Sequence, residues 1–177
     1  MTEHFEYSHT IGIASFNGRG FMNPVDVRFS NADLIFVLSR SNASNKNVRV
    51  SVQTLDSEYL YEFARWGTDP GLTMQPTAIA IDREDRVYIT DEFMNNVSIF
   101  DVEGTFIKRW GRFGTEPGLF NRPSGIAIDS DQNVFVVDHL NSRIQKLTKD
   151  GEFISSFGSK GTDLGELNYP WGIAIDS

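Results

Sequence analysis

The stretch Pro-Ser-Gly-Ile-Ala-Ile-Asp at residues 123–129 has two close copies in this chain. They read Pro-Thr-Ala-Ile-Ala-Ile-Asp at 76–82 and Pro-Trp-Gly-Ile-Ala-Ile-Asp at 170–176, so the period is 47 residues (123 − 76 and 170 − 123). A weaker copy, Pro-Val-Asp-Val-Arg-Phe-Ser at 24–30, begins 52 residues before Pro76 (76 − 24). Self-similarity at such a period is the signature of a repeat architecture.

Each period contains four short runs in which apolar residues alternate with polar ones, separated by Asp-, Asn- and Gly-containing turns. This pattern predicts β-strands joined by tight turns, and four antiparallel strands in 40 to 50 residues are typical of one β-propeller blade. The predicted strands of the two clearest periods are Thr77–Asp82, Val87–Asp91, Val97–Val102, Phe106–Trp110, Ser124–Asp129, Val134–Asp138, Ile144–Leu147 and Phe153–Phe157.

We therefore predict an all-β fold, with residues 1–177 forming one incomplete propeller domain. Its parts are an outer strand and loop of the closing blade at 5–23, blades at 24–75, 76–122 and 123–169, and the first strand of a next blade at 170–177. The blade at 24–75 is predicted to carry two insertions. Three extra residues fall within Arg40–Asn47 and five near Asp56–Glu58.

The first strand of each period has one bulky and one small face. Ile79 and Ile81 alternate with Ala78 and Ala80, which suits an innermost strand where blades converge. At the end of the fourth run, an aromatic residue followed by Gly is predicted to plug the space between neighbouring blades. These aromatic residues are Trp66, Trp110 and Phe157.

Composition narrows the classes of function. The 177 residues include 16 Lys and Arg, 24 Asp and Glu and no Cys, for a formal net charge of −8. The absence of Cys excludes disulfides, thiolate metal sites and cysteine catalysis. Negative charge argues against nucleic-acid and membrane partners, which favour basic surfaces. No signal peptide or membrane-spanning run is seen, so a cytoplasmic location is the default expectation.

The repeats resemble NHL repeats. The third period reproduces that family's pattern at Pro123–Asp129, Asp138, Asn141–Gln145 and Phe157-Gly158. The second period departs from it at Met94–Ser98, and the first has Ser39 in place of the Asp. The resemblance implies an NHL-type β-propeller, usually of six blades, in a family that includes binding platforms, sensor domains and a few enzymes. With about three full blades and partial blades at both ends, the chain is expected to be a fragment of a six-bladed ring, because bare strand edges are avoided in proteins.

The resemblance also bears on metal binding. One relative of this fold, the peptidyl-hydroxyglycine amidating lyase, binds zinc through His residues placed just after the blade-opening Pro. The matching positions here are Val25, Thr77, Ser124 and Trp171. We therefore predict no metal site, no cofactor and no catalytic residue in the blades that this chain contains.

The loops between the fourth and first strands and between the second and third strands are expected to share one face, around the axial funnel. Asp26 and Arg28 stand where the other copies have Ala or Gly, and either form a space-filling ion pair or line the tunnel as polar groups. Asp138 and Arg143 are expected to fix a turn, either as an ion pair or through hydrogen bonds from the backbone to Asp138. The candidate ligand-binding residues are Asp26, Arg28, Arg40, Thr77, Ser124, His139, Asn141, Arg143 and Trp171.

The leading hypothesis is a non-catalytic binding or scaffold module for a peptide, glycan or small ligand at the axial face. The alternative is a metal-dependent lactonase- or lyase-like enzyme whose ligands lie in missing blades. A third hypothesis, RNA binding, is disfavoured by the net charge.

Overall fold

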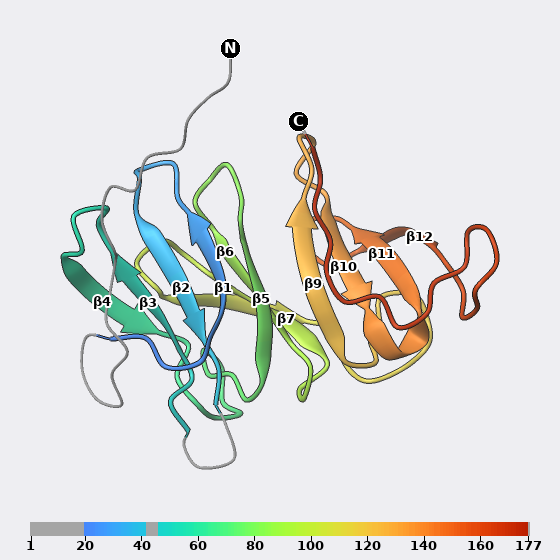
Figure 1. Ribbon diagram of the computed structural model, residues 1–177, viewed down its shortest axis with the longest axis horizontal. Coiled ribbons are helices and arrows are strands. Elements are labelled where there is room, and N and C mark those ends of the chain that lie inside the picture. The colour runs from blue at the N-terminus through green and yellow to red at the C-terminus, as the bar shows by residue number, and fades with distance from the viewer. Residues whose placement is uncertain (1–19, 42–45, 177) are drawn as a thin grey trace.

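The computed structural model describes residues 20–41 and 46–176, which form three four-stranded antiparallel sheets (Figure 1). In each sheet the strands follow chain order, so each sheet is a meander and corresponds to one predicted blade. A short 3₁₀ helix, η1 (His139–Asn141), joins the second and third strands of the last sheet. The strands are β1 (Pro24–Phe29), β2 (Ile35–Ser39), β3 (Arg49–Gln53), β4 (Tyr59–Phe63), β5 (Pro76–Ile81), β6 (Val87–Asp91), β7 (Asn96–Phe100), β8 (Phe106–Trp110), β9 (Pro123–Ile128), β10 (Val134–Asp138), β11 (Arg143–Leu147) and β12 (Phe153–Phe157).

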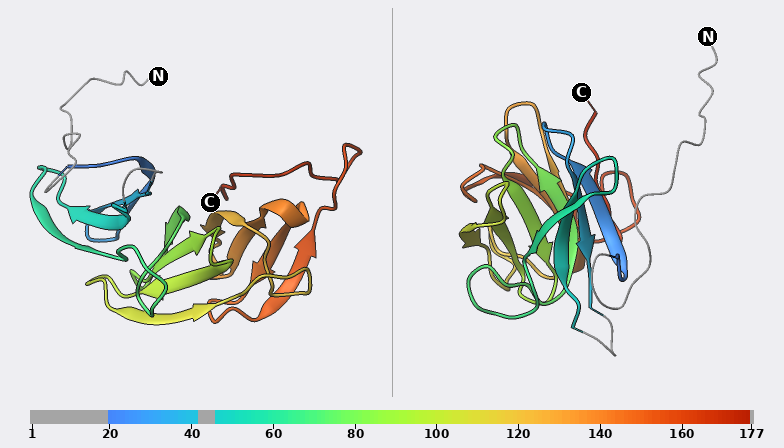
Figure 2. Two further views of the ribbon diagram at one scale, coloured as in Figure 1. Left: turned by 90° about the horizontal axis from the view of Figure 1, so that it is seen from below. Right: turned by 90° about the vertical axis from the view of Figure 1, so that its left-hand side faces the viewer.

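The three blades follow one another around an arc, as the view from below shows (Figure 2). The first strands β1, β5 and β9 are neighbours on the inner side, where β5 contacts both of the others. The all-β propeller prediction is thus confirmed, and the predicted strands are observed with shifts of one or two residues at their ends.

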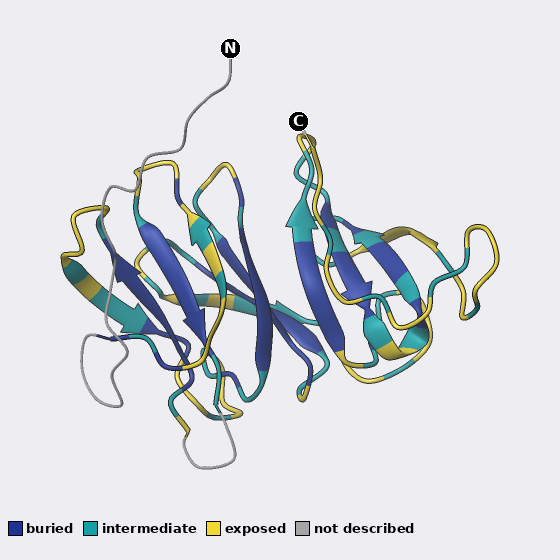
Figure 3. Cartoon of the chain, viewed as in Figure 1, coloured by how far each residue is buried: buried dark blue, intermediate teal, exposed yellow. Residues whose placement is uncertain are grey.

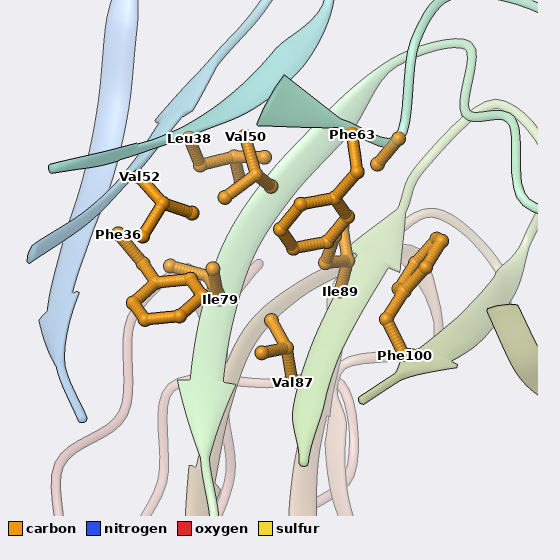
Figure 4. Packing of buried hydrophobic residues seen from close by; sticks show 10 residues of the cluster. Phe36, Leu38, Val50, Val52, Phe63, Ile79, Val87, Ile89 and Phe100 are labelled. Atoms are coloured by element: carbon orange, nitrogen blue, oxygen red, sulfur yellow. The ribbon is translucent and has the colours of Figure 1, made fainter. Parts of the chain in front are cut away.

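Buried residues are concentrated on the strands of the blades (Figure 3). The apolar ones form two cores, one between the first and second blades and one between the second and third. Strand alternation sends neighbouring residues of one strand to different cores, so Ile79 of β5 packs towards the first blade and Ala78 towards the third. In the core between the first two blades, Phe36 and Phe63 face Ile79 and Phe100 (Figure 4). The apolar cores therefore lie between blades, so each blade packs on its neighbours, as in other repeat folds.

The small face of the inner strands is required by close approach of the next chain segment. A Cβ on Gly125 would lie 2.8 Å from the Trp171 carbonyl oxygen and 3.0 Å from the Ile173 nitrogen. The Gly125 amide instead donates a 2.9 Å hydrogen bond to the Trp171 carbonyl. The bulky and small faces predicted from sequence thus point towards the two neighbouring blades.

The insertion in the first blade differs from the prediction. From the first blade to the second, corresponding strands start 52 residues apart for β1 and β2 but 47 apart for β3 and β4 (76 − 24, 87 − 35, 96 − 49, 106 − 59). All five extra residues therefore lie between β2 and β3. The predicted insertion near Asp56–Glu58 is wrong, because the β3–β4 connection is as long as its counterparts.

The same register corrects the assignment of one aromatic plug. Phe63, not Trp66, ends β4 and lies 47 residues before Trp110. Phe63 is buried between the first two blades, and Trp110 packs on Phe120 with ring centroids 6.0 Å apart. Trp66 lies in the following loop, exposed, with the Lys46 ammonium over its ring. Phe157, the counterpart in the last blade, is 54% exposed and plugs nothing among the described residues.

The structure describes only one of the two predicted partial blades. The outer strand predicted within 5–23 falls almost wholly outside the described residues. Residues 170–176 are not a strand: they run beside β9, joined to it by the Gly125–Trp171 backbone hydrogen bond, and a strand needs a regular ladder of such bonds. No helix in the described part of the chain is long and apolar enough to cross a membrane.

Candidate functional site

The loops that follow β2, β6 and β10 and those that lead into β5 and β9 come together on one side of the arc, which we call the loop face. The Glu92 amide donates to the Gln75 carbonyl, and the Leu140 amide donates to the Asn121 carbonyl. The prediction that these two kinds of loop share a face is therefore confirmed for the described blades.

Buried aspartates at the ends of β6 and β10 fix these loops. Asp91 accepts hydrogen bonds from the backbone amides of Met74, Phe93 and Met94, at 2.6, 3.0 and 2.9 Å. A carboxylate that satisfies several amides at once holds a short loop in one conformation. The residue after Asp91, Glu92, is thereby placed at the base of the loop face.

Glu92 binds two arginines. Its Oε1 accepts a hydrogen bond from Arg40 Nη2, and its Oε2 accepts from Arg122 Nε at 3.0 Å and from Arg122 Nη2 at 2.6 Å. The Glu92 side chain is only 4% exposed, whereas that of Arg122 is about half exposed. One buried carboxylate thus orders two guanidinium groups that reach the surface.

The backbone also directs Arg122 to this place. Arg122 precedes the blade-opening Pro123 and has a left-handed backbone, with φ at 55°. Its amide donates to Asn95 Oδ1 at 2.8 Å. The equivalent residues Asn23 and Tyr169 are also left-handed, with φ at 47° and 50°. Non-glycine residues adopt this conformation at a cost, and such positions concentrate at functional sites.

These side chains border a groove of about 560 Å³ on the loop face. Its apolar lining is supplied by Phe93 and Phe113, which are 62% and 67% exposed. Two ordered cations beside two accessible aromatic rings can bind a ligand that has both an anionic and an apolar part. We call this the arginine groove; it is lined by Arg40, Gln75, Glu92, Phe93, Asn95, Phe113, Asn121 and Arg122.

The structure gathers a second set of predicted residues along the inner strands. Asp26, Arg28, Thr77, Ser124 and Trp171 all line an axial pocket of about 200 Å³. Asp26 and Arg28 form an ion pair of 2.6 Å, as the space-filling interpretation predicts.

Hydrogen bonds between blades occupy several polar groups of the axial pocket. Asp26 Oδ2 accepts from the Ile79 amide of the next blade at 3.0 Å. The Thr77 hydroxyl contacts the Ser124 carbonyl at 3.1 Å, and the Ser124 hydroxyl donates to the Trp171 carbonyl at 2.8 Å. These groups join neighbouring repeats and are therefore already engaged in holding the blades together.

Asn141 and Arg143 belong to a buried network around Asp138. Asp138 Oδ2 accepts from Arg143 Nε at 2.7 Å, from Asn141 Nδ2 at 2.9 Å and from Gln145 Nε2 at 3.0 Å. The predicted Asp138–Arg143 ion pair is therefore present. Arg143 also donates to the Leu119 carbonyl at 3.0 Å, which ties the loop before β9 to β11.

His139 lies apart from the arginine groove. Its Nδ1 is 3.0 Å from the Pro170 carbonyl oxygen, and its ring packs against Tyr169 and Trp171, with centroid separations of 5.7 and 5.0 Å. Within residues 20–41 and 46–176, no three His, Asp or Glu side chains are grouped as a metal site requires.

Of the predicted site residues, only Arg40 lines the arginine groove. Sequence reasoning missed Gln75, Glu92 and Arg122 as candidates. The sequence contains one signal that Arg40 and Glu92 lie near each other. They occupy equivalent positions, 52 residues apart, in adjacent blades and carry opposite charges. Arg122 could have been found as the residue before a blade-opening Pro.

Comparison with known families agrees with this architecture. A family model described as 6-bladed beta-propeller matches residues 67–156, half of the chain. The chain belongs to this family. No curated protein matches the sequence of this propeller.

Solved structures similar to this propeller share its fold at low sequence identity. Virginiamycin B lyase from Staphylococcus aureus is 17% identical with a TM-score of 0.61, over 85% of this chain and 44% of that one. A putative exported protein from Bacteroides fragilis is 13% identical with a TM-score of 0.65, over 88% and 43%. Hydrazine synthase from Kuenenia stuttgartiensis is 19% identical with a TM-score of 0.57, over 85% and 39%. The propeller described here thus spans less than half the length of these structures.

Proposed function

We propose that this chain is part of an NHL-type propeller that acts as a non-catalytic binding or scaffold module, and that it holds a peptide, glycan or small ligand in the arginine groove. The observation that supports this most strongly is the buried Glu92 carboxylate, which orders Arg40 and Arg122 at the edge of a 560 Å³ groove. Loops held on a rigid β-scaffold are where propellers and other repeat folds place recognition.

The other candidate residues support the scaffold that presents this groove. The Thr77 hydroxyl joins β5 to β9, and the Ser124 hydroxyl joins β9 to the segment at 170–176. Asp138 with Arg143 fixes the loops of the third blade. A preorganised site of this kind lowers the entropic cost of binding, because its side chains are already ordered before the ligand arrives.

A ligand screen tests the proposal. Thermal unfolding of the whole protein would be followed with peptides, glycans and metabolites in turn, for the wild type and for Asn121→Trp, which fills the groove with an indole. The matched control is Asp131→Trp, a substitution at an exposed site in the β9–β10 turn, on the opposite face.

The proposal predicts that at least one compound raises the unfolding temperature of the wild type and of Asp131→Trp but not of Asn121→Trp. Ligand binding to the folded state raises stability by mass action, so a shift that depends on the groove reports binding there. A screen without any such compound, or a shift that persists in Asn121→Trp, would overturn the proposal.

A further inference from the structure

The charge in the arginine groove is opposite in sign to that of the whole chain. Its lining holds two guanidinium groups and one carboxylate, and no other ionisable side chain, so the groove carries a net charge of +1 in a chain of net charge −8. A local positive potential in an acidic protein selects for anions, because it attracts them where the rest of the surface repels them.

The two arginines keep hydrogen-bonding capacity for such an anion. The side-chain hydrogen bonds of Arg40 and Arg122 use Nε and Nη2, with Gln75 and Glu92 as acceptors. Among the described residues, Nη1 of each guanidinium therefore has donors left. A planar guanidinium matches the geometry of a carboxylate, and Glu92 already holds both groups in place.

The apolar part of the groove restricts the class of ligand further. Phe93 and Phe113 are the two most exposed phenylalanines of the described residues. An aromatic ring is a suitable partner, because offset-stacked and edge-to-face contacts between rings are favourable and bury both surfaces. The groove volume of about 560 Å³ lies within the range of about 300–1,000 Å³ that small-ligand sites usually have.

We propose that the arginine groove binds a carboxylate that carries an aromatic ring, with the carboxylate at Arg40 and Arg122 and the ring at Phe93 and Phe113. This inference rests on the proposed function and names its ligand class. A free aromatic acid and the C-terminal residue of a peptide ending in phenylalanine present the same chemistry, and the test separates them.

The probe is N-acetyl-phenylalanine, titrated into the whole protein by calorimetry beside its neutral amide, acetate and a tetrapeptide ending in phenylalanine. We expect the acid to bind at least tenfold more tightly than the amide or acetate, and more weakly at high salt. If the tetrapeptide binds more tightly than N-acetyl-phenylalanine, the ligand is a peptide C-terminus. If the two bind equally, the ligand is a free aromatic acid. Equal affinity for the acid and its amide would overturn the inference.

Two variants connect binding to the groove. Arg122→Gln should weaken acid binding at least tenfold, while Arg83→Gln, at an exposed arginine of the β5–β6 turn on the opposite face, should leave it unchanged. Glu92→Gln replaces one of the two acceptor oxygens with an NH2 donor, so the side chain can hold only one of the two guanidinium groups. A folded Glu92→Gln protein should therefore bind the acid more weakly, and unchanged binding would contradict the role of Glu92 in ordering the two arginines.

Failure of this inference is distinguishable from failure of the proposed function. If neutral peptides or glycans bind in a manner that Asn121→Trp abolishes, while N-acetyl-phenylalanine does not bind, the ligand class is wrong and the binding module stands. If nothing binds at the groove, both are wrong. Unchanged acid binding in a folded Arg122→Gln variant would also overturn the ligand class.

Discussion

Gly151 packs directly on the indole of Trp110, so that a Cβ on Gly151 would lie 2.7 Å from Trp110 Cδ2. The same contact recurs one blade earlier, where a Cβ on Gly104 would lie 2.6 Å from Phe63 Cγ. In both cases the aromatic residue ends the outer strand of one blade, and the glycine lies in the outer turn of the next. This pair of residues therefore joins successive blades at their outer edge.

Trp110→Ala should lower the free energy of unfolding by about 3 kcal/mol, the low end of the usual cost for a large aromatic side chain, because Trp110 is partly buried against the core between the second and third blades. The matched control is Phe157→Ala, at the same position of the next repeat, where the side chain is exposed and a loss below about 0.5 kcal/mol is expected. Urea unfolding of both variants measures the difference. Similar losses in the two variants would contradict the role of Trp110 between blades.

Asp26 and Arg28 should respond unequally to substitution. Arg28→Ala removes a partly exposed ion pair and should cost at most about 1 kcal/mol. Asp26→Ala also leaves the buried Ile79 amide without its acceptor and should cost about 1–3 kcal/mol. Chemical unfolding of the single and double variants tests this. A double variant that is more stable than Asp26→Ala would show that the ion pair, not the bond to Ile79, dominates.

Removal of the Asp138 carboxylate should be among the most damaging single changes. Asp138→Ala leaves Arg143 and the Asn121 amide without their shared acceptor, and breaking a buried ion pair costs about 3–5 kcal/mol. Asp131→Ala, at an exposed turn position, is the control and should stay within about 0.5 kcal/mol of the wild type. Thermal unfolding of the two variants side by side is the measurement, and equal stability would contradict the importance of the network.

Part of the loss of stability in acid should come from protonation of the Asp129 carboxylate. Burial opposes ionisation of this carboxyl, but hydrogen bonds from Asn133 and the nearby Lys146 ammonium outweigh it and hold the pKa of Asp129 below its ordinary value. Its contribution is therefore complete above about pH 4, where the unfolded side chain is ionised, and is lost as the pH falls through the lowered folded-state pKa.

Asp129→Asn should accordingly narrow the difference in stability between pH 6 and pH 3. Urea unfolding of the wild type and the variant at both values measures this difference. An unchanged difference would mean that other carboxylates account for the acid sensitivity.

The inner strands could be predicted from sequence because their signal is local and repeated. The alternation of Ile with Ala or Gly after each blade-opening Pro gave β5 and β9 with nearly correct bounds. The sequence predicts that the outer strand of the first blade ends at Trp66, because Trp66-Gly67 resembles Trp110-Gly111, whereas the strand ends at Phe63. Ala64, which takes the place of Gly111, is left-handed with φ at 52°, and a left-handed alanine has no signature in the sequence.

The arginine groove could be predicted only in part. The repeat spacing places Arg40 and Glu92 at equivalent positions of neighbouring blades, which is enough to expect that they lie near each other. Arg122 is 30 residues from Glu92, and its contact depends on the left-handed backbone before Pro123 and on the Asn95 hydrogen bond. Such loop geometry follows from tertiary contacts that no local pattern encodes.

The left-handed residues before Pro24, Pro123 and Pro170 have a consequence for how this surface can diversify. Asn23, Arg122 and Tyr169 share one backbone conformation although their side chains are an amide, a cation and a phenol. The conformation is therefore set by the surrounding loop and not by the side chain. New chemistry can be introduced on the loop face one blade at a time, by a single codon change that leaves the cores between blades untouched.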